Sequence, residues 1–212
     1  MPLFFQYHID DATRVAIWKI EEDESFFTEY VPLQRTITHP FKRLQHLAGR
    51  YLLQHLFSDF PISLIQIADT KKPFLEDEQY HFSISHCHEY AGVIVSKNKR
   101  VGIDIEIISD KVARIRKKFL IQEEQDLLIT QMKNAGPSSE LAWLTLAWSC
   151  KEAAFKWYGK GEVDFKNHMV IDKIIGDENA ILIQMAFKKN EDRLLDLHSS
   201  FFNDLVLTYV FT

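Results

Sequence analysis

The stretch Trp148-Ser-Cys-Lys-Glu-Ala-Ala-Phe-Lys156 decides how this 212-residue chain is interpreted. At the 3.6-residue period of an α-helix, Glu152 falls between Trp148 and Phe155 on an apolar face, and Lys156 lies one turn further on. A carboxylate among large apolar side chains destabilises a fold unless a cation or hydrogen bonds compensate it. The sequence therefore predicts a helix on which Glu152 has a partner elsewhere in the chain.

The composition is that of an ordinary globular protein, with 46% hydrophobic and 26% charged residues. The formal net charge of −5 argues against nucleic acid as the main partner, because phosphate backbones select basic surfaces. No stretch approaches the ~18 apolar residues of a membrane span, and the first residues do not resemble a signal peptide. With Cys87 and Cys150 as the only cysteines, we expect a cytoplasmic, reduced protein.

Strand and helix patterns follow one another along the chain and predict an α+β fold. Helices are expected at residues 40–57, at residues 122–133 and around Glu152, where Ser138 or Ser139 would begin the helix and Gly159 would end it. Strands are expected at residues 14–20, 64–68, 80–85, 91–96, 100–107, 169–175, 180–188, 194–202 and 205–211. Each half thus has a helix followed by several strands, which suggests a duplicated architecture.

The segment Val101-Gly-Ile-Asp-Ile-Glu-Ile107 alternates without a break. In a strand, Asp104 and Glu106 would share one face, roughly 7 Å apart. A half-buried strand with a solvated acidic face would explain the pattern. Gly102 on the same face favours a second interpretation, since a glycine lets another group approach closely. Together with Glu152, these carboxylates would form the oxygen-rich site that suits Mg²⁺.

The segment Phe82-Ser-Ile-Ser-His-Cys-His88 ends a predicted strand with polar side chains. A zinc site here lacks a second ligand pair, and a serine hydrolase would require a nucleophile elbow that this segment does not have. A loop that contacts phosphate or ribose fits the hydroxyl and imidazole groups. A simple turn with local hydrogen bonds remains an alternative.

Basic residues occur in small groups although the chain is acidic overall. Arg43 and Arg50 lie seven residues apart, so they project along one flank of the predicted helix 40–57. Lys72 is followed by Pro73, and residues 111–118 carry five basic side chains. Such groups could supply the positive charge that a polyphosphate ligand requires, or they could be solvated surface. Lys156 could likewise form only an ordinary helix ion pair with Glu152.

Taken in order, these motifs closely resemble the 4′-phosphopantetheinyl transferases, and the length is similar to the two-lobed, surfactin-synthetase-activating type. The motifs are Lys72-Pro73, Phe82-Ser-Ile-Ser-His86, Val101-Gly-Ile-Asp-Ile-Glu106 and Trp148-Ser-Cys-Lys-Glu-Ala-Ala-Phe-Lys156. Two further segments are similar to elements of that family: Leu47-Ala-Gly-Arg50 and Phe119-Leu-Ile-Gln-Glu-Glu124.

The resemblance implies two similar α/β lobes, residues 1–100 and 101–212, related by pseudo-twofold symmetry with the active site between them. It implies an enzyme that transfers phosphopantetheine from coenzyme A to a serine of an apo acyl, peptidyl or polyketide carrier protein and releases 3′,5′-ADP. Mg²⁺ would be required, and a chain with two lobes is expected to be a monomer. A non-catalytic module that binds coenzyme A or a nucleotide, and another Mg²⁺-dependent phosphoryl or nucleotidyl transferase, are the alternatives.

The resemblance also assigns roles to residues. Asp104, Glu106 and Glu152 would hold the metal, and Lys156 would contact the phosphates. Glu152 is the first candidate for the base that accepts the serine proton, and Glu124 is the second. The remaining coenzyme A contacts would come from Arg43, Arg50, Lys72, Pro73, Ser85 and His86.

Carrier proteins of this family's reactions present an acidic helix beside their serine, whereas this chain is itself acidic. Attraction between the two would then require a local basic patch. The run from Lys111 to Lys118 is our candidate, although it could equally be the solvated face of a helix.

Overall fold

The structure is a computed structural model that describes residues 2–33, 36–134, 139–177, 180–190 and 192–212. It divides into two compact units, Met1–Val101 and Gly102–Thr212. Each unit combines a sheet with helices, which confirms the predicted α+β class. Among the described residues, no helix is long and apolar enough to cross a membrane. The pseudo-twofold relation between two lobes stays a prediction.

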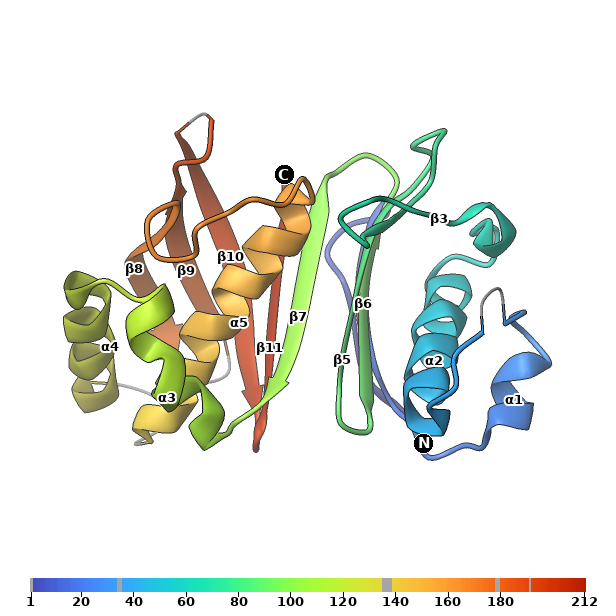
Figure 1. The fold of residues 1–212 in the computed structure, drawn as a ribbon, viewed down its shortest axis with the longest axis horizontal. Helices are drawn as coiled ribbons and strands as arrows, with labels where there is room; N and C mark the ends of the chain where they lie inside the picture. Colours follow the sequence, from blue (N-terminus) through green and yellow to red (C-terminus); the bar gives the residue numbers. More distant parts are fainter. Residues whose placement is uncertain (1, 34–35, 135–138, 178–179, 191) are drawn as a thin grey trace. The chain divides into compact units, whose positions relative to one another are not determined.

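A four-stranded antiparallel sheet with the order β1-β2-β6-β5 forms the centre of unit 1. Its strands are β1 Leu3–His8, β2 Thr13–Lys19, β5 His81–Cys87 and β6 Tyr90–Ser96. Helix α2, Pro40–Leu56, packs across β2 and β6 (Figure 1). The sequence patterns predict α2, β2, β5 and β6 to within about two residues, but they do not predict β1.

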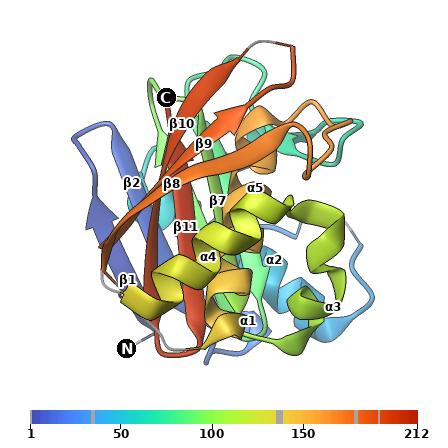
Figure 2. The ribbon, with the colours of Figure 1, turned by 90° about the vertical axis from the view of Figure 1, so that its left-hand side faces the viewer.

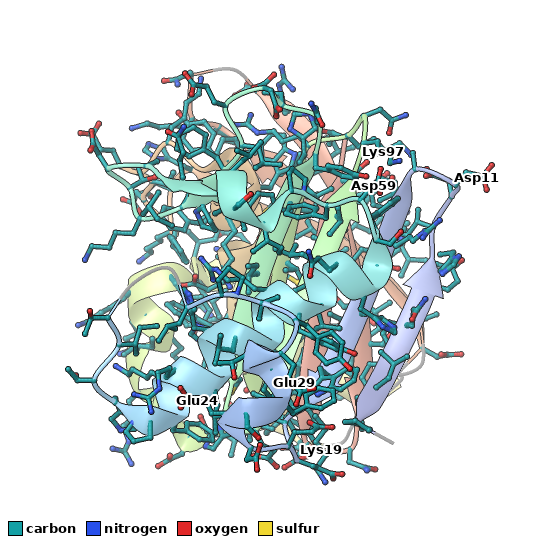
Figure 3. The ribbon with its side chains drawn as sticks, turned by 90° about the vertical axis from the view of Figure 1, so that its right-hand side faces the viewer. Asp11, Lys19, Glu24, Glu29, Asp59 and Lys97 are labelled. Carbon is teal, nitrogen blue, oxygen red and sulfur yellow. The ribbon has the colours of Figure 1, made fainter. Side chains whose placement is uncertain are left out.

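The remaining elements of unit 1 are short. They are α1 Glu24–Thr28, the 3₁₀ helix η1 Ile62–Leu64, β3 Gln66–Ile67 and β4 Pro73–Phe74. The strand predicted at residues 64–68 shrinks to β3, because its only partner in the two-stranded sheet is the equally short β4. Figure 3 shows α1 beside α2, and Glu24, labelled there, begins α1.

A five-stranded sheet with the order β7-β11-β10-β9-β8 forms the centre of unit 2. Its strands are β7 Val101–Ile107, β8 Met169–Asp177, β9 Ala180–Phe187, β10 Arg193–Phe202 and β11 Leu205–Phe211. The last four form an antiparallel meander. Helix α5, Glu140–Tyr158, lies along this sheet, and α3, Asp110–Phe119, and α4, Gln122–Asn134, pack on α5 (Figures 1 and 2). All five strands lie close to their predicted positions.

Helix α5 ends as its sequence predicts. Gly159 adopts the left-handed conformation with φ of 72°, and its N–H donates to the Phe155 carbonyl at 2.9 Å. Ser139 occupies the N-cap position, although its side chain makes no capping hydrogen bond. The alternative cap, Ser138, lies outside the described residues.

The buried face of α5 differs from the predicted one. Trp148, Glu152 and Phe155 are only partly buried. A neighbouring stripe at helical spacing is buried throughout: Leu144, Ala147, Lys151, Ala154 and Tyr158. The charged group inside the apolar stripe is therefore Lys151, one residue before the glutamate that the sequence pattern points to.

Candidate active site

Strand β7 and helix α5 approach closely at Gly102. A Cβ atom at this position would lie 2.2 Å from the Ala153 carbonyl oxygen and 2.6 Å from the Trp157 backbone nitrogen. Both neighbours are backbone atoms of α5, so only a glycine fits here without displacing the helix. Because side chains alternate along a strand, Asp104 and Glu106 lie on this α5-facing side of β7.

Lys156 links α5 to β7. Its Nζ lies 2.7 Å from Oδ1 of Asp104, and the two side chains are 25% and 4% exposed. Burial of Asp104 contradicts the alternative of a fully solvated acidic face on this strand. The contact between residues 52 positions apart also shows that Lys156 does more than form a local helix ion pair.

Glu152 lies near enough to the β7 carboxylates to be affected by their charges. Burial, together with the negative charges of Asp104 and Glu106, raises the pKa of Glu152 from its ordinary value of 4.5 to about 7, although the positive charge of Lys156 opposes the shift. A carboxylate with such a pKa accepts a proton readily near neutrality. The same mutual repulsion would be relieved by a cation placed among the three groups.

Within the described part of the chain, no three His, Cys, Asp or Glu side chains converge as a formed metal-binding group. Asp104 instead interacts with Lys156. The donor set nevertheless fits a hard divalent cation, since it consists of carboxylate oxygens that repel one another in a partly buried place. Asp104, Glu106 and Glu152 therefore remain the candidate ligands. Lys156 forms an ion pair with Asp104 and so partly compensates the negative charge of this group.

Glu124 is buried inside unit 2, whereas a catalytic base must reach the substrate. Its carboxylate is 1% exposed and forms an ion pair with Lys151, whose side chain is fully buried, at 2.7 Å. The backbone N–H groups of Ile121 and Ile171 also donate to it, each at 2.9 Å. These three donors occupy the carboxylate inside unit 2, where it is shielded from solvent. The role of Glu124 as the second candidate base stays a prediction, and its contacts favour the less buried Glu152 as the first candidate.

Lys151 is the charged residue of this region that sequence reasoning missed. It stands four residues after Ala147 and three before Ala154, which is the spacing of a buried helix face. A lysine at a core position is unusual enough to have been a signal, because buried lysines require partners. The sequence pattern predicts the next residue, Glu152, as the buried charged group, whereas its side chain is only partly buried.

The two arginines of α2 have partners within unit 1. Arg43 forms an ion pair of 2.7 Å with Glu24 of α1, a residue labelled in Figure 3, and donates to the Ile37 carbonyl at 3.2 Å. Arg50 is buried, and its Nη1 lies 3.1 Å from Nδ1 of His46, one turn earlier. They share a helix flank as predicted, but Arg50 is the more deeply buried of the two.

The other predicted anion-binding residues of unit 1 lie near strand ends. Burial and, to a smaller extent, the positive charge of Arg100 lower the pKa of Lys72 from its ordinary value of 10.5 to about 8. Such a lysine would be stabilised by an anion. Pro73 begins β4 directly after it. Ser85 is buried near the end of β5 and His86 is exposed, so a ligand at this strand end would meet them on opposite faces.

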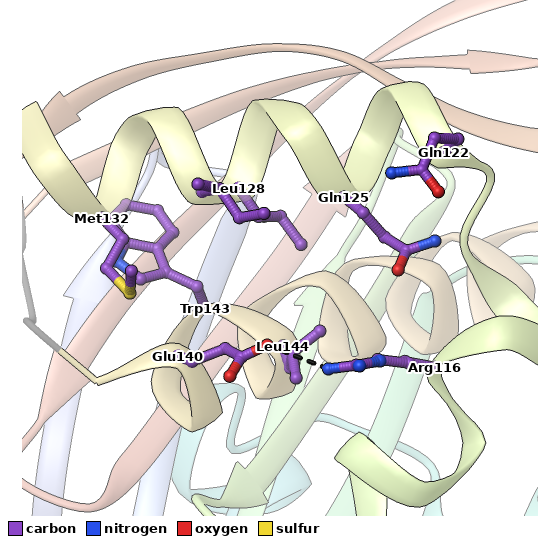
Figure 4. Close-up of a pocket in the computed structure, with 9 residues that line it drawn as sticks. Arg116, Gln122, Gln125, Leu128, Met132, Glu140, Trp143 and Leu144 are labelled. Atoms are coloured by element: carbon purple, nitrogen blue, oxygen red, sulfur yellow. Dashed lines mark hydrogen bonds and ion pairs between the residues drawn. The ribbon is translucent and has the colours of Figure 1, made fainter.

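Unit 2 also has a pocket of about 120 Å³ between α3, α4 and α5 (Figure 4). An ion pair between Arg116 and Glu140 at 2.9 Å lies at one side of it. The other lining residues are Gln122, Gln125, Leu128, Ile129, Met132, Trp143 and Leu144. None of these belongs to the predicted site, so the pocket is separate from the carboxylates of β7 and α5.

Comparison with known proteins identifies the family of this chain. The sequence profile of the 4′-phosphopantetheinyl transferase superfamily matches residues 100–210, which include β7, α5 and the candidate site. The chain belongs to this superfamily.

Relatives with known names point to the same group. The chain is 32% identical over 153 residues to "4′-phosphopantetheinyl transferase gsp" of Aneurinibacillus migulanus, over 72% of this chain and 61% of that protein. It is 34% identical over 143 residues to "Enterobactin synthase component D" of Escherichia coli (strain K12), over 64% of this chain and 63% of the relative. The protein of that name from Salmonella austin is 30% identical over 115 residues, 54% of this chain and 47% of the relative. The chain thus matches less than two thirds of each relative.

Proposed function

We propose that this chain transfers the 4′-phosphopantetheine group of coenzyme A to a serine hydroxyl of an apo carrier protein, with Mg²⁺ present. The observation that carries the proposal is the group formed by Asp104, Glu106, Glu152 and Lys156 where β7 meets α5. Three mutually repelling carboxylates and a lysine are the groups expected where a metal and a diphosphate bind together. Membership of the superfamily supports the same reaction.

In this reaction the serine oxygen forms a bond to the β-phosphorus of the coenzyme A diphosphate, and the bond from that phosphorus to the oxygen of 3′,5′-ADP breaks. Asp104, Glu106 and Glu152 would hold Mg²⁺, which when bound neutralises charge on the diphosphate oxygens. Lys156 would move from Asp104 towards the phosphates and stabilise the developing negative charge. Glu152 is the candidate that accepts the serine proton, directly or through a water molecule, because its pKa of about 7 suits a general base.

The remaining coenzyme A contacts that we propose are the cations and polar side chains predicted from the sequence. Lys72 and Arg50 suit this role because both are charged groups removed from bulk solvent. Ser85 and His86 would add contacts from the end of β5, and Pro73 would fix the segment after Lys72. Arg43 is the weakest member of the set, because Glu24 already binds its guanidinium group. We also propose that the chain acts as a monomer.

Mass spectrometry of an apo carrier protein incubated with the chain, coenzyme A and Mg²⁺ tests the function. A mass gain of about one phosphopantetheine group supports the proposal. No gain across acyl, peptidyl and polyketide carrier proteins, with coenzyme A still bound, would support a non-catalytic binding module. Turnover of ATP in place of coenzyme A would indicate another phosphoryl or nucleotidyl transferase.

Mg²⁺ affinity should rise with pH up to about 7. The metal binds the ionised carboxylate of Glu152, whose pKa of about 7 means that only about a tenth of the molecules are ionised one pH unit lower. We expect the dissociation constant for Mg²⁺, measured from the metal-induced rise in melting temperature, to be about tenfold higher at pH 6 than at pH 8. Equal affinities at the two pH values would contradict the placement of the metal beside Glu152.

The basic surface of α3 is the proposed docking site for the acidic helix of the carrier protein. Arg114 pairs with Asp110, and Arg116 pairs with Glu140 as Figure 4 shows, so neither arginine projects an uncompensated charge. Lys111, Lys117 and Lys118 are exposed on the same helix. These lysines, more than the two arginines, supply the positive charge for long-range attraction.

Charge reversal by Lys117→Glu and Lys118→Glu together should raise the KM for the carrier protein about tenfold and leave coenzyme A affinity unchanged. The effect should weaken in high salt, because it comes from screened surface charges. Lys133→Glu with Lys173→Glu, two exposed lysines elsewhere in unit 2, is the matched control. An equal effect of both double variants would mean that overall charge, and no local patch, governs docking.

A further inference from the structure

Lys151 and Glu124 form a buried ion pair directly beside the candidate site, and we propose that this pair positions Glu152 for metal and substrate binding. The proposal rests on the proposed function of Glu152. It makes Lys151 and Glu124 positioning residues, since neither would touch the substrate. The pair joins several elements of unit 2 around one turn of α5.

The ammonium group of Lys151 has three oxygen atoms around it. Nζ donates to the Phe119 carbonyl at the end of α3 at 2.5 Å, to the Phe165 carbonyl at 2.9 Å and to Glu124 Oε1 of α4 at 2.7 Å. These three acceptors match the three N–H donors of a lysine. A side chain fixed from three directions holds the helix turn that carries it.

Glu124 extends the connection to two more places. Its Oε2 accepts the N–H of Ile121 in front of α4, which is half of a capping box, and its Oε1 accepts the N–H of Ile171 in β8. The pair therefore ties α5 to α3, α4, β8 and the segment after α5. The side chains of Lys151 and Glu124 are both buried, and the charged end of each is held by hydrogen bonds.

The residues whose carbonyls bind Lys151 also pack their rings on α5. The Phe119 ring lies 5.1 Å from that of Trp148, edge to face. The Phe165 ring lies 5.5 Å from Trp148 and 5.6 Å from Phe155. Trp148 and Phe155 flank Glu152 on the helix, so the same two segments fix the turns on both sides of the glutamate.

Helix α5 is thus held on two sides. Gly102 of β7 contacts its backbone at Ala153 and Trp157, and Lys151 is held from the side of α3 and α4. A rotation of about 20° around the helix axis would move a carboxylate at the helix surface by about 2 Å, which is enough to lose a metal ligand. The two contacts together prevent that rotation.

Stability alone does not require a charged pair at this place. A buried ion pair is often no more stable than apolar residues of similar volume, because both charges lose their hydration. Directional hydrogen bonds do what apolar packing does less well: they fix the orientation of the helix turn. The buried polar network therefore fits a positioning role better than a purely stabilising one.

The double variant Lys151→Met with Glu124→Gln tests the proposal. Lys151→Met alone would leave a buried carboxylate uncompensated and would unfold the unit, whereas the double variant removes both charges with little change of shape. We expect circular dichroism like that of the wild type, Mg²⁺ affinity at least about tenfold lower in thermal-shift titrations, and kcat at least about tenfold lower. The KM for the carrier protein should stay within about twofold.

Leu146→Ala is the control, because it creates a cavity in the same helix without touching the ion pair. It should lower the melting temperature and leave Mg²⁺ affinity within about twofold. Glu124→Asp is a second variant that keeps the charge but withdraws the carboxylate by one methylene group, and it should lower kcat at constant KM. Wild-type Mg²⁺ affinity and kcat in both Glu124 variants would overturn the positioning role alone. No Mg²⁺ effect on the wild type would overturn the proposed metal site and this inference with it.

Discussion

Replacing Glu152 with glutamine should lower the rate of phosphopantetheine transfer by at least about 10³-fold while the fold stays intact. The substitution removes a candidate metal ligand and the candidate proton acceptor together, and each role commonly contributes about 10² or more to the rate. Transfer measured by mass gain on the carrier protein under saturating coenzyme A gives the rate. Far-ultraviolet circular dichroism reports the fold.

The same substitution should stabilise the metal-free protein above neutral pH. In the unfolded chain the carboxyl group of Glu152 loses its proton near 4.5, whereas in the folded protein its pKa is about 7. The unfolded state therefore binds fewer protons between these values, and stability of the wild type falls as pH rises through this window. The glutamine variant lacks this loss, so its melting temperature at pH 8 should exceed that of the wild type by roughly 2–4 °C.

Glu123→Gln is the matched control for this experiment. Glu123 is an exposed glutamate of α4, so its replacement is the same chemical change at a position away from the site. It should alter neither the transfer rate nor the pH dependence of the melting temperature. A Glu152→Gln variant with full activity would show that the carboxylates of β7 and α5 are not the reacting site, whatever its stability.

The sequence predicts the elements of unit 2 well because their patterns are long and regular. Strand β7 alternates over its whole length. Gly102 in that pattern predicts the close approach of another group, which the structure shows to be the backbone of α5. Helix α5 has apolar residues on more than one side, so its periodicity does not single out one face. For that reason the choice between the stripes of Glu152 and Lys151 required the structure.

Local sequence patterns also do not predict contacts between distant parts of the chain. The contact of Lys156 with Asp104 joins residues 52 positions apart, and that of Lys151 with Glu124 joins α5 to α4. Spacing along one helix suggests only the near neighbour Glu152 as a partner for Lys156. The resemblance to the family points to Glu124, and the structure supplies the contacts on which we base its proposed positioning role.

Gly102→Ala should strongly destabilise unit 2. The new Cβ would lie 2.2 Å from the carbonyl oxygen of Ala153 and 2.6 Å from the backbone nitrogen of Trp157, and backbone atoms cannot turn away as a side chain can. Helix α5 must therefore move away from β7. Overpacking of this kind costs about 3 kcal/mol or more, and the melting temperature should fall by roughly 6–12 °C.

Displacement of α5 should also impair transfer in the molecules that remain folded, since it carries Glu152 and Lys156 away from Asp104. Urea unfolding gives the stability, and Mg²⁺ titration of the folded variant should show weaker binding than in the wild type. Measuring both stability and Mg²⁺ affinity separates loss of stability from displacement of α5. A variant that is merely less stable would still bind the metal normally at low temperature.

Gly49→Ala is the matched control, because it makes the same change at another buried glycine. Its Cβ would meet the Cγ2 atom of Ile84 at 2.9 Å, which is a side-chain contact that can adjust. Alanine also favours a helix interior over glycine by about 1 kcal/mol, so the net change should lie within about 1 kcal/mol. If Gly102→Ala were as harmless as Gly49→Ala, the backbone contact between β7 and α5 could not be what holds the carboxylates and Lys156 together.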